Sequence, residues 1–266
     1  MAAYAVLLLW PLIGVVRASV QSGGQPLFTE YARFFSSPLF RAVLWRTMSL
    51  SLLATAVTVV LSFPVAVYLA QPGRRGRTIV TFAIIAPMLV SAVARSYGWI
   101  IILGPEGLVS RIGVFLGLGD SSGHLLYTEL GVIIALVHLQ LPLMVLPIAG
   151  SLQQIDPALD RAASILGAGW LRIFLKVTLP LAAPGMTAGA VIVFCMSASS
   201  FVTPALIGGP TIPMMSFVIY QQAVQLIDWP FASAASVILL LATASVTLAY
   251  LFWAGRGARR RTRRTA

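Results

Sequence analysis

The stretch from Ile155 to Gly185 reads IDPALDRAASILGAGWLRIFLKVTLPLAAPG and lies between two apolar runs of membrane-spanning length. Asp156 and Pro157 mark a helix start, because an aspartate accepts hydrogen bonds from first-turn N–H groups and proline fits the first helical position. Apolar side chains then recur at helical spacing, at Leu159, Ala162, Ala163 and Leu166. The same spacing recurs after Gly167 and ends at Pro180, with Trp170, Ile173, Phe174 and Val177. The pattern predicts two short amphipathic helices joined at a glycine. These helices could form a docking element, or they could be a pair of surface helices that only links two spans.

The composition places the chain in a membrane. Of its 266 residues, 59% are hydrophobic and 9% are charged, whereas a soluble domain carries about 25% charged residues. The apolar runs are continuous over about 20 residues, which is typical of membrane helices, and they lack the alternation of membrane β-barrels. The sequence therefore predicts an all-α integral membrane protein.

Six apolar runs divide the chain into a single transmembrane domain, residues 1–266. The predicted spans cover about 2–20, 47–70, 78–103, 129–152, 181–201 and 231–253. The segment 202–226 is also apolar, but its prolines and glycines would break a spanning helix early. We expect a re-entrant or interfacial segment there, on the outer face.

The charge distribution predicts the topology. The net charge is +11, and the tail over 256–266 contributes Arg256, Arg259, Arg260, Arg261, Arg263 and Arg264. Six spans with both termini in the cytoplasm place 12 basic and two acidic residues inside, against six basic and five acidic residues outside. This is the positive-inside bias, so we expect the tail to contact membrane lipid and not nucleic acid.

Several kinds of chemistry have no counterpart in the sequence. The only lysine, Lys176, follows Leu175, so no Walker A motif is present and the chain is predicted not to hydrolyse ATP itself. His124 and His138 lack partners at metal-ligand spacing. We therefore predict no catalytic residue, metal or cofactor. The acidic residues outside the quoted stretch lie in loops or at span ends, which disfavours an ion-coupled carrier and implies that energy comes from a partner.

A longer spacing runs through the quoted stretch. Arg161-Ala162-Ala163 is followed after three residues by Gly167, and nine residues later by Val177-Thr178-Leu179-Pro180. This resembles the EAA loop of bacterial ABC-importer permeases, in which Glu stands where this chain has Arg161. The resemblance implies a cytoplasmic coupling helix over 157–176, between spans four and five, that docks on an ATPase subunit. It assigns ATPase coupling to Leu159, Asp160, Arg161, Ala162, Ala163, Leu166, Gly167 and Pro180. With arginine at the head of the motif, the acidic contact falls either to Asp160 or to the partner.

Three further stretches, 94–99, 201–210 and 228–231, resemble spermidine/putrescine importer permeases. The resemblance implies a bacterial plasma (inner) membrane complex of a dimer of ABC ATPase subunits, a second and distinct permease, and a periplasmic or extracellular solute-binding protein. It also implies a polyamine-like substrate. Related permeases for iron, sulfate or phosphonate share this build, so an anionic substrate stays open, as does a stand-alone channel or secondary carrier.

Polar and aromatic residues near the predicted outer face are candidates for the substrate path. Arg95 lies 17 residues into the third predicted span, about 25 Å along a straight helix, so we expect it near the outer boundary. Acids and aromatic faces suit a polyamine, whereas an arginine suits an anion. The full candidate set is Arg95, Tyr97, Trp99, Glu106, Phe201, Thr203, Asp228 and Trp229.

Overall fold

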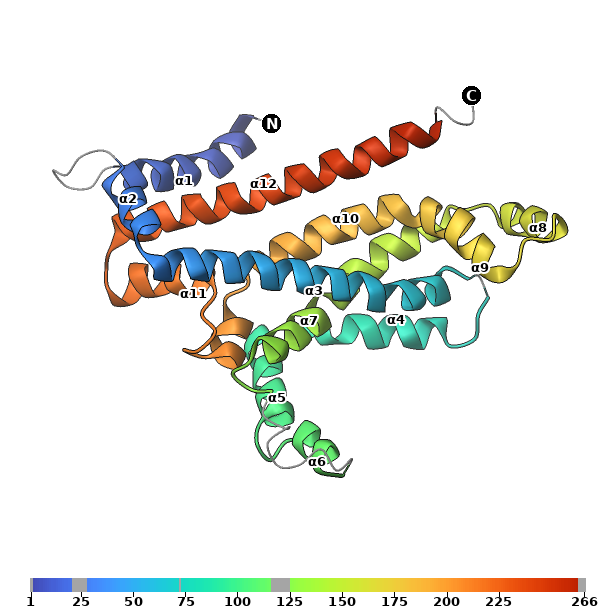
Figure 1. Cartoon of the computed structure of the whole chain (residues 1–266), viewed down its shortest axis with the longest axis horizontal. Helices are drawn as coiled ribbons and strands as arrows, with labels where there is room; N and C mark the ends of the chain where they lie inside the picture. The colour runs from blue at the N-terminus through green and yellow to red at the C-terminus, as the bar shows by residue number, and fades with distance from the viewer. Residues whose placement is uncertain (1, 21–27, 72, 116–124, 263–266) are drawn as a thin grey trace.

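A computed structural model describes residues 2–20, 28–71, 73–115 and 125–262. These residues form helices joined by turns, with no strand among them (Figure 1). The predicted all-α class is therefore confirmed.

Three long helices form the centre of the molecule: α3 (Pro38–Ala70), α7 (Glu129–Gln153) and α10 (Leu179–Ala198). Glycine lets α10 approach α7 closely, since a Cβ at Gly185 would lie 2.3 Å from the backbone oxygen of Pro147. A Cβ at Gly189 would lie 2.7 Å from the sulfur of Met144. Small residues at such contacts are typical of membrane helices, and apolar side chains such as Ile148 and Val193 fill the space between them.

A row of small hydroxyl side chains follows the buried face of α3, at Thr47, Ser51, Thr55, Thr58 and Ser62. Three of them donate to the carbonyl oxygen four residues earlier, so the helix itself satisfies their hydrogen bonds.

The third predicted span, 78–103, is divided in the structure. Helix α4 (Arg77–Ile85) runs into the 3₁₀ turn η1 (Ala86–Leu89), Val90 is extended, and α5 (Ala92–Leu103) then begins with Ser91 as its cap. The prediction of one continuous helix is wrong because Pro87 lacks an N–H group and its carbonyl oxygen accepts the Val90 N–H in a tight turn instead. Beyond the break, α5 and the short α6 (Leu108–Phe115) turn away from the direction of α3 and α4 (Figure 1).

The quoted stretch also differs from its prediction. Helix α8 (Pro157–Ile165) is separate, but α9 (Trp170–Ile173), the π-helical turn η3 (Phe174–Thr178) and α10 form one continuous helical path. Pro180 was expected to end the second amphipathic helix. It instead lies in the first turn of α10, directly after η3, a position where a helix tolerates proline.

Helix α12 (Trp229–Thr262) packs along α1 (Ala2–Val20), and the short α2 (Thr29–Ser36) joins them at one end (Figure 1). Phe34, Val218 and Phe231 belong to the apolar cluster at this junction. The end of α12, α8 and the basic turn before α4 all lie toward the opposite end of the long axis, on the right in Figure 1.

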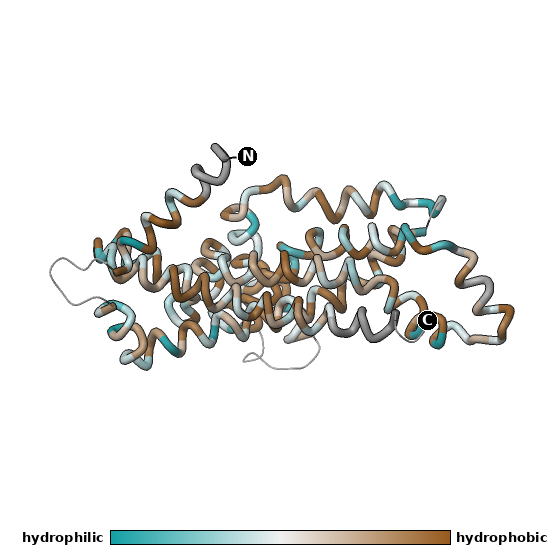
Figure 2. The backbone as a smooth tube through the Cα atoms, turned by 90° about the horizontal axis from the view of Figure 1, so that it is seen from above, coloured by the Kyte–Doolittle hydropathy of each residue, from teal (hydrophilic) through white to brown (hydrophobic). Residues whose placement is uncertain are grey.

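Five helices in the described residues are long and apolar enough to cross a membrane: Pro38–Ala70, Ala92–Phe115, Glu129–Gln153, Trp170–Ala198 and Trp229–Gly255. The apolar parts of α1 and of α4 with η1 are shorter, at Leu9–Val20 and Arg77–Leu89. Apolar colouring runs along most of the helices in Figure 2. The membrane class is clear, and the count of six spans stays a prediction.

The segment 202–226 forms no long helix. It consists of η4 (Pro204–Gly208), α11 (Met215–Tyr220) and η5 (Gln221–Gln225). Its backbone is tied into the bundle, since the Met215 N–H donates to Thr47 Oγ1 at 2.9 Å and the Ile207 oxygen accepts from the Tyr127 N–H. Burial of Ile207 and Met215 closes this end of the core.

Candidate coupling surface and translocation cavity

Helix α8 starts and ends as its sequence predicts. Asp156 Oδ1 accepts the Ala158 N–H at 2.8 Å and so caps the first turn. Gly167 takes a φ of +77°, a left-handed conformation that glycine adopts without steric cost. This turn lets the Ala168 N–H bond to the Ala163 oxygen, which closes the helix. The side chains of Asp160, Arg161 and Ala162, predicted to carry coupling, lie outside the described part of the chain.

Large apolar side chains stand exposed around this turn. Leu166 is 87% exposed and Trp170 is 77% exposed, and Leu159, Ile165 and Leu171 are also exposed. Such a concentration of exposed apolar side chains on two adjoining helices is typical of an interaction surface, and the predicted coupling role stays a prediction. The surface combines two predicted coupling residues, Leu159 and Leu166, with residues of α9.

An aromatic chain connects this surface to the core. The Trp170 ring stacks on Phe174 with a centroid distance of 5.8 Å, and Phe174 meets Phe63 of α3 edge to face at 5.3 Å. Because α9 also continues into α10, the exposed surface is joined to α3 by packed contacts and to α10 by continuous helical backbone.

A cavity of about 310 Å³ lies where the broken third span meets the middle of α7 and the end of α10. It brings together three of the predicted substrate-path residues, Arg95, Phe201 and Thr203. The rest of its wall consists of Met88, Ala92, Leu139, Gln140, Leu143, Met196, Ser199, Ser200 and Val202. Arg95 therefore faces the middle of α7. The third span is not the straight helix that the expected position of Arg95 assumed, and its place near the outer boundary stays a prediction.

Polar atoms in this wall are only partly satisfied. Gln140 Nε2 donates to Ser197 Oγ at 2.7 Å, while Gln140 Oε1 is buried without a hydrogen-bond partner. Arg95 Nε is also buried without a partner. Thr203 is nearly fully buried, and its Oγ1 lies 3.4 Å from Ser96 Oγ.

The other predicted path residues lie elsewhere. Trp99 Nε1 donates to His138 Nδ1 at 3.3 Å. Tyr97 and Trp229 are exposed, and so is Glu106, in the turn between α5 and α6. None of these residues, nor Asp228, lines the cavity.

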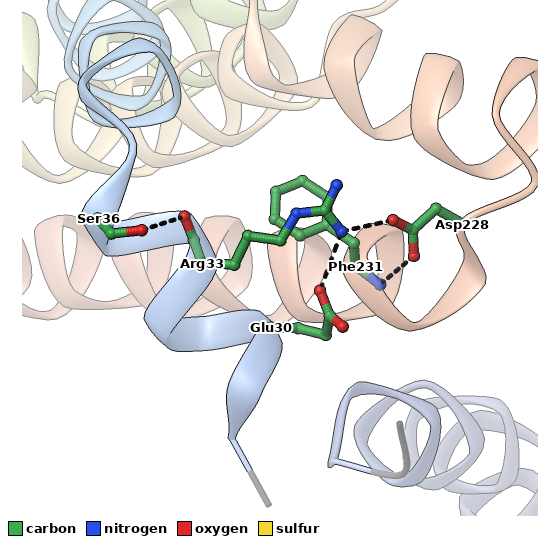
Figure 3. Close-up of polar contacts among 5 residues, drawn as sticks. All are labelled: Glu30, Arg33, Ser36, Asp228 and Phe231. Atoms are coloured by element: carbon green, nitrogen blue, oxygen red, sulfur yellow. Dashed lines mark hydrogen bonds and ion pairs between the residues drawn. The ribbon is translucent and has the colours of Figure 1, made fainter. Parts of the chain in front are cut away.

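Asp228 instead belongs to an ionic cluster that joins α2 to the start of α12 (Figure 3). Arg33 Nη1 lies 2.7 Å from Asp228 Oδ2 and 3.3 Å from Glu30 Oε2, and its guanidinium covers the Phe231 ring at 4.5 Å. The hydrogen bond from Arg33 to Asp228 is the main cause that raises the pKa of Arg33, and partial burial opposes it. Arg33 therefore stays charged at neutral pH, and it pairs with Asp228, one of the predicted path residues, and with Glu30.

Sequence reasoning did not assign Gln140, Ser199 or Ser200 to the path. One signal was present: Gln140 is an amide in the middle of the apolar run of α7. The two serines carried no such signal, because small hydroxyl residues are common at packed helix contacts.

Comparison with known proteins places these features in a family. The family model described as binding-protein-dependent transport system inner membrane component matches residues 62–261. The chain belongs to this family. It is thus a multi-pass inner-membrane permease component of an ABC importer.

Two relatives and one structure illustrate the breadth of the similarity. The spermidine/putrescine transport system permease protein PotB of Escherichia coli (strain K12) is 33% identical over 221 residues, covering 83% of this chain and 80% of PotB. The molybdenum transport system permease protein ModB of Azotobacter vinelandii is 29% identical over 163 residues, covering 61% and 70% of the two chains. A bacterial ABC transporter that imports the acidic polysaccharide alginate has the same fold, with a TM-score of 0.79 at 20% identity and coverage of 96% and 95%.

Proposed function

We propose that this permease pairs with a second, distinct permease, and that the 310 Å³ cavity lies on the path that the pair forms for a small solute. A solute-binding protein delivers the solute, as the family description indicates. Both termini lie in the cytoplasm, together with α8 and the arginine tail.

The energy comes from a dimer of ABC ATPase subunits that dock on the exposed surface around Leu166 and Trp170. The observation that carries this proposal is the continuity of that surface with α10, which reaches the cavity at Met196. Closure of the ATPases would push α8 and α9, and the continuous helical path through η3 would carry the movement to the cavity wall.

The docking role is tested by replacing Leu166 with Asp, which puts a charge on the exposed apolar surface. We expect the ATPase subunit to be lost when the complex is purified through this chain. Leu226→Asp is the matched control, because Leu226 is also exposed but lies between η5 and α12, and it should retain the ATPase. Full ATPase retention in Leu166→Asp would contradict the docking role.

A stand-alone channel or secondary carrier is the competing interpretation. Solute uptake by proteoliposomes that contain only this chain, without ATP, would support it. Uptake that requires the ATPase, ATP and the binding protein together supports the importer.

The relatives and the cavity favour different substrate features. The similarity to PotB favours an amine-bearing solute of the polyamine class. Arg95 favours a solute with an anionic group. Identifying the ligand that co-purifies with the partner binding protein tests the class directly.

A further inference from the structure

The described wall of the cavity beside Arg95 carries positive charge and no negative charge. Arg95 is the only charged side chain among the described residues that line it. Arg95 Nε is buried without a hydrogen-bond partner, and no described acid lies within ion-pair distance of the guanidinium.

Three of the described acids form ion pairs with other arginines. Arg33 pairs with Glu30 and Asp228, and Arg46 pairs with Glu129 at 3.2 Å. A charged side chain inside a membrane protein is unfavourable unless it is paired, and such residues are usually functional. Arg95 as a whole is partly exposed, so its guanidinium is open to a counter-charge that the described acids do not supply.

Neutral polar groups complete the arrangement. Ser197 fixes one end of the Gln140 carboxamide and leaves the other end unpartnered in the cavity wall. Ser199, Ser200 and Thr203 add hydroxyl groups to the same wall. A guanidinium binds a carboxylate with two parallel hydrogen bonds, and amide and hydroxyl groups orient the remainder of a small molecule.

We propose that this cavity binds the carboxylate of a small organic solute, with Arg95 as its counter-charge and Gln140 as an orienting partner. The inference rests on the proposed function, in which the cavity lies on the transport path. A solute with an amine at one end and a carboxylate at the other agrees with both the PotB similarity and Arg95. A diamine lacks the group that Arg95 binds.

The charge of the cavity is measured by thiol labelling in the purified complex. Cys195, the only cysteine of this chain, is replaced by Ser, and Ser200→Cys places one thiol in the cavity wall. Labelling by 2-sulfonatoethyl and by 2-aminoethyl methanethiosulfonate is followed by the mass of this chain alone. We expect Arg95→Met to lower the ratio of anionic to cationic labelling rates by about tenfold, the effect of one nearby charge at reduced dielectric. Ser36→Cys, outside the cavity, should show no such change.

Protection experiments identify the ligand class. The probes are 4-aminobutanoate and putrescine, which have the same four-carbon chain and differ in having a carboxylate or a second amine. We expect only 4-aminobutanoate to slow labelling of Ser200→Cys, and Arg95→Met to abolish that protection. Arg95→Lys should keep the labelling ratio but weaken protection, because it keeps the charge and loses the planar fork.

Some results would overturn the inference. An unchanged labelling ratio in Arg95→Met, or protection by putrescine and not by 4-aminobutanoate, would do so. These outcomes are separate from a failure of the proposed function, which would appear as uptake that needs neither ATP nor the ATPase while the labelling ratio still depends on Arg95.

Discussion

Helices α7 and α12 are almost equally apolar and both are long enough to cross a membrane, yet they are buried to very different extents. In the most apolar part of each, 61% of α7 is buried within the chain, against 11% of α12. Helix α7 packs against α3 and α10, whereas α12 is covered mainly at its first turns, where Phe231, Ala234 and Ala235 are fully buried. Apolar character therefore places both helices in the membrane, but contact residues such as glycine decide which one forms the core.

The largest expected effect comes from closing the gap between α7 and α10. Gly185→Leu would put a side chain where a Cβ alone already lies 2.3 Å from the Pro147 oxygen. We expect no monodisperse protein from this variant in gel filtration. Gly255→Leu on α12 is the control, since a Cβ there meets nothing within 4 Å, and it should elute as the wild type does. The same gel-filtration profile for both variants would contradict the assignment of α10 to the core and of α12 to the periphery.

A pair of truncations measures the same contrast in free energy. Ile148 of α7 is fully buried, whereas Leu248 of α12 is 66% exposed. Ile148→Ala should lower the free energy of unfolding by about 2–4 kcal/mol, because it leaves a cavity in the core. Leu248→Ala should change it by less than about 0.5 kcal/mol. Denaturant titration in detergent checks both values, and a loss at Leu248 as large as that at Ile148 would contradict the peripheral position of α12.

The smallest expected change in stability comes from the ionic cluster, which joins the first turns of α12 to α2. Arg33 is half exposed, so solvent screens its ion pairs and Arg33→Ala should lower the free energy of unfolding by only about 1 kcal/mol. The double variant with Asp228→Ala should cost less than the sum of the two single variants, because they share one interaction. Strict additivity would show that the Arg33–Asp228 pair contributes nothing to anchoring α12.

Sequence spacing located the exposed surface of α8 and α9 well, because caps, glycine turns and helical periodicity are local properties. Asp156 and Gly167 act as their residue types predict, and Leu159 and Leu166 are exposed. Residue spacing did not predict the effects of Pro87 and Pro180, although both prolines lie within apolar sequence. The helix breaks at Pro87, whereas the helical path continues through Pro180 directly after a π-helical turn.

The candidate cavity was only half visible in the sequence. Arg95, Phe201 and Thr203 were among the predicted residues, but Asp228 and Glu106 were equally plausible. Which of these candidates line the cavity depends on contacts between residues far apart in the chain. One such contact is the pair of Arg33 with Asp228, which are 195 positions apart.

The sequence by itself determined that this is a helical membrane permease component with an exposed apolar surface at α8 and α9, because hydropathy, capping and motif spacing are written along the chain. Only the tertiary structure decided that α7 lies in the core and α12 at the edge, and that Arg95 faces a cavity with no acid among its described lining residues. Those outcomes depend on which helix faces pack together. Gly185 allows α10 to approach α7 closely, and the break after Pro87 sets the direction of α5, which carries Arg95.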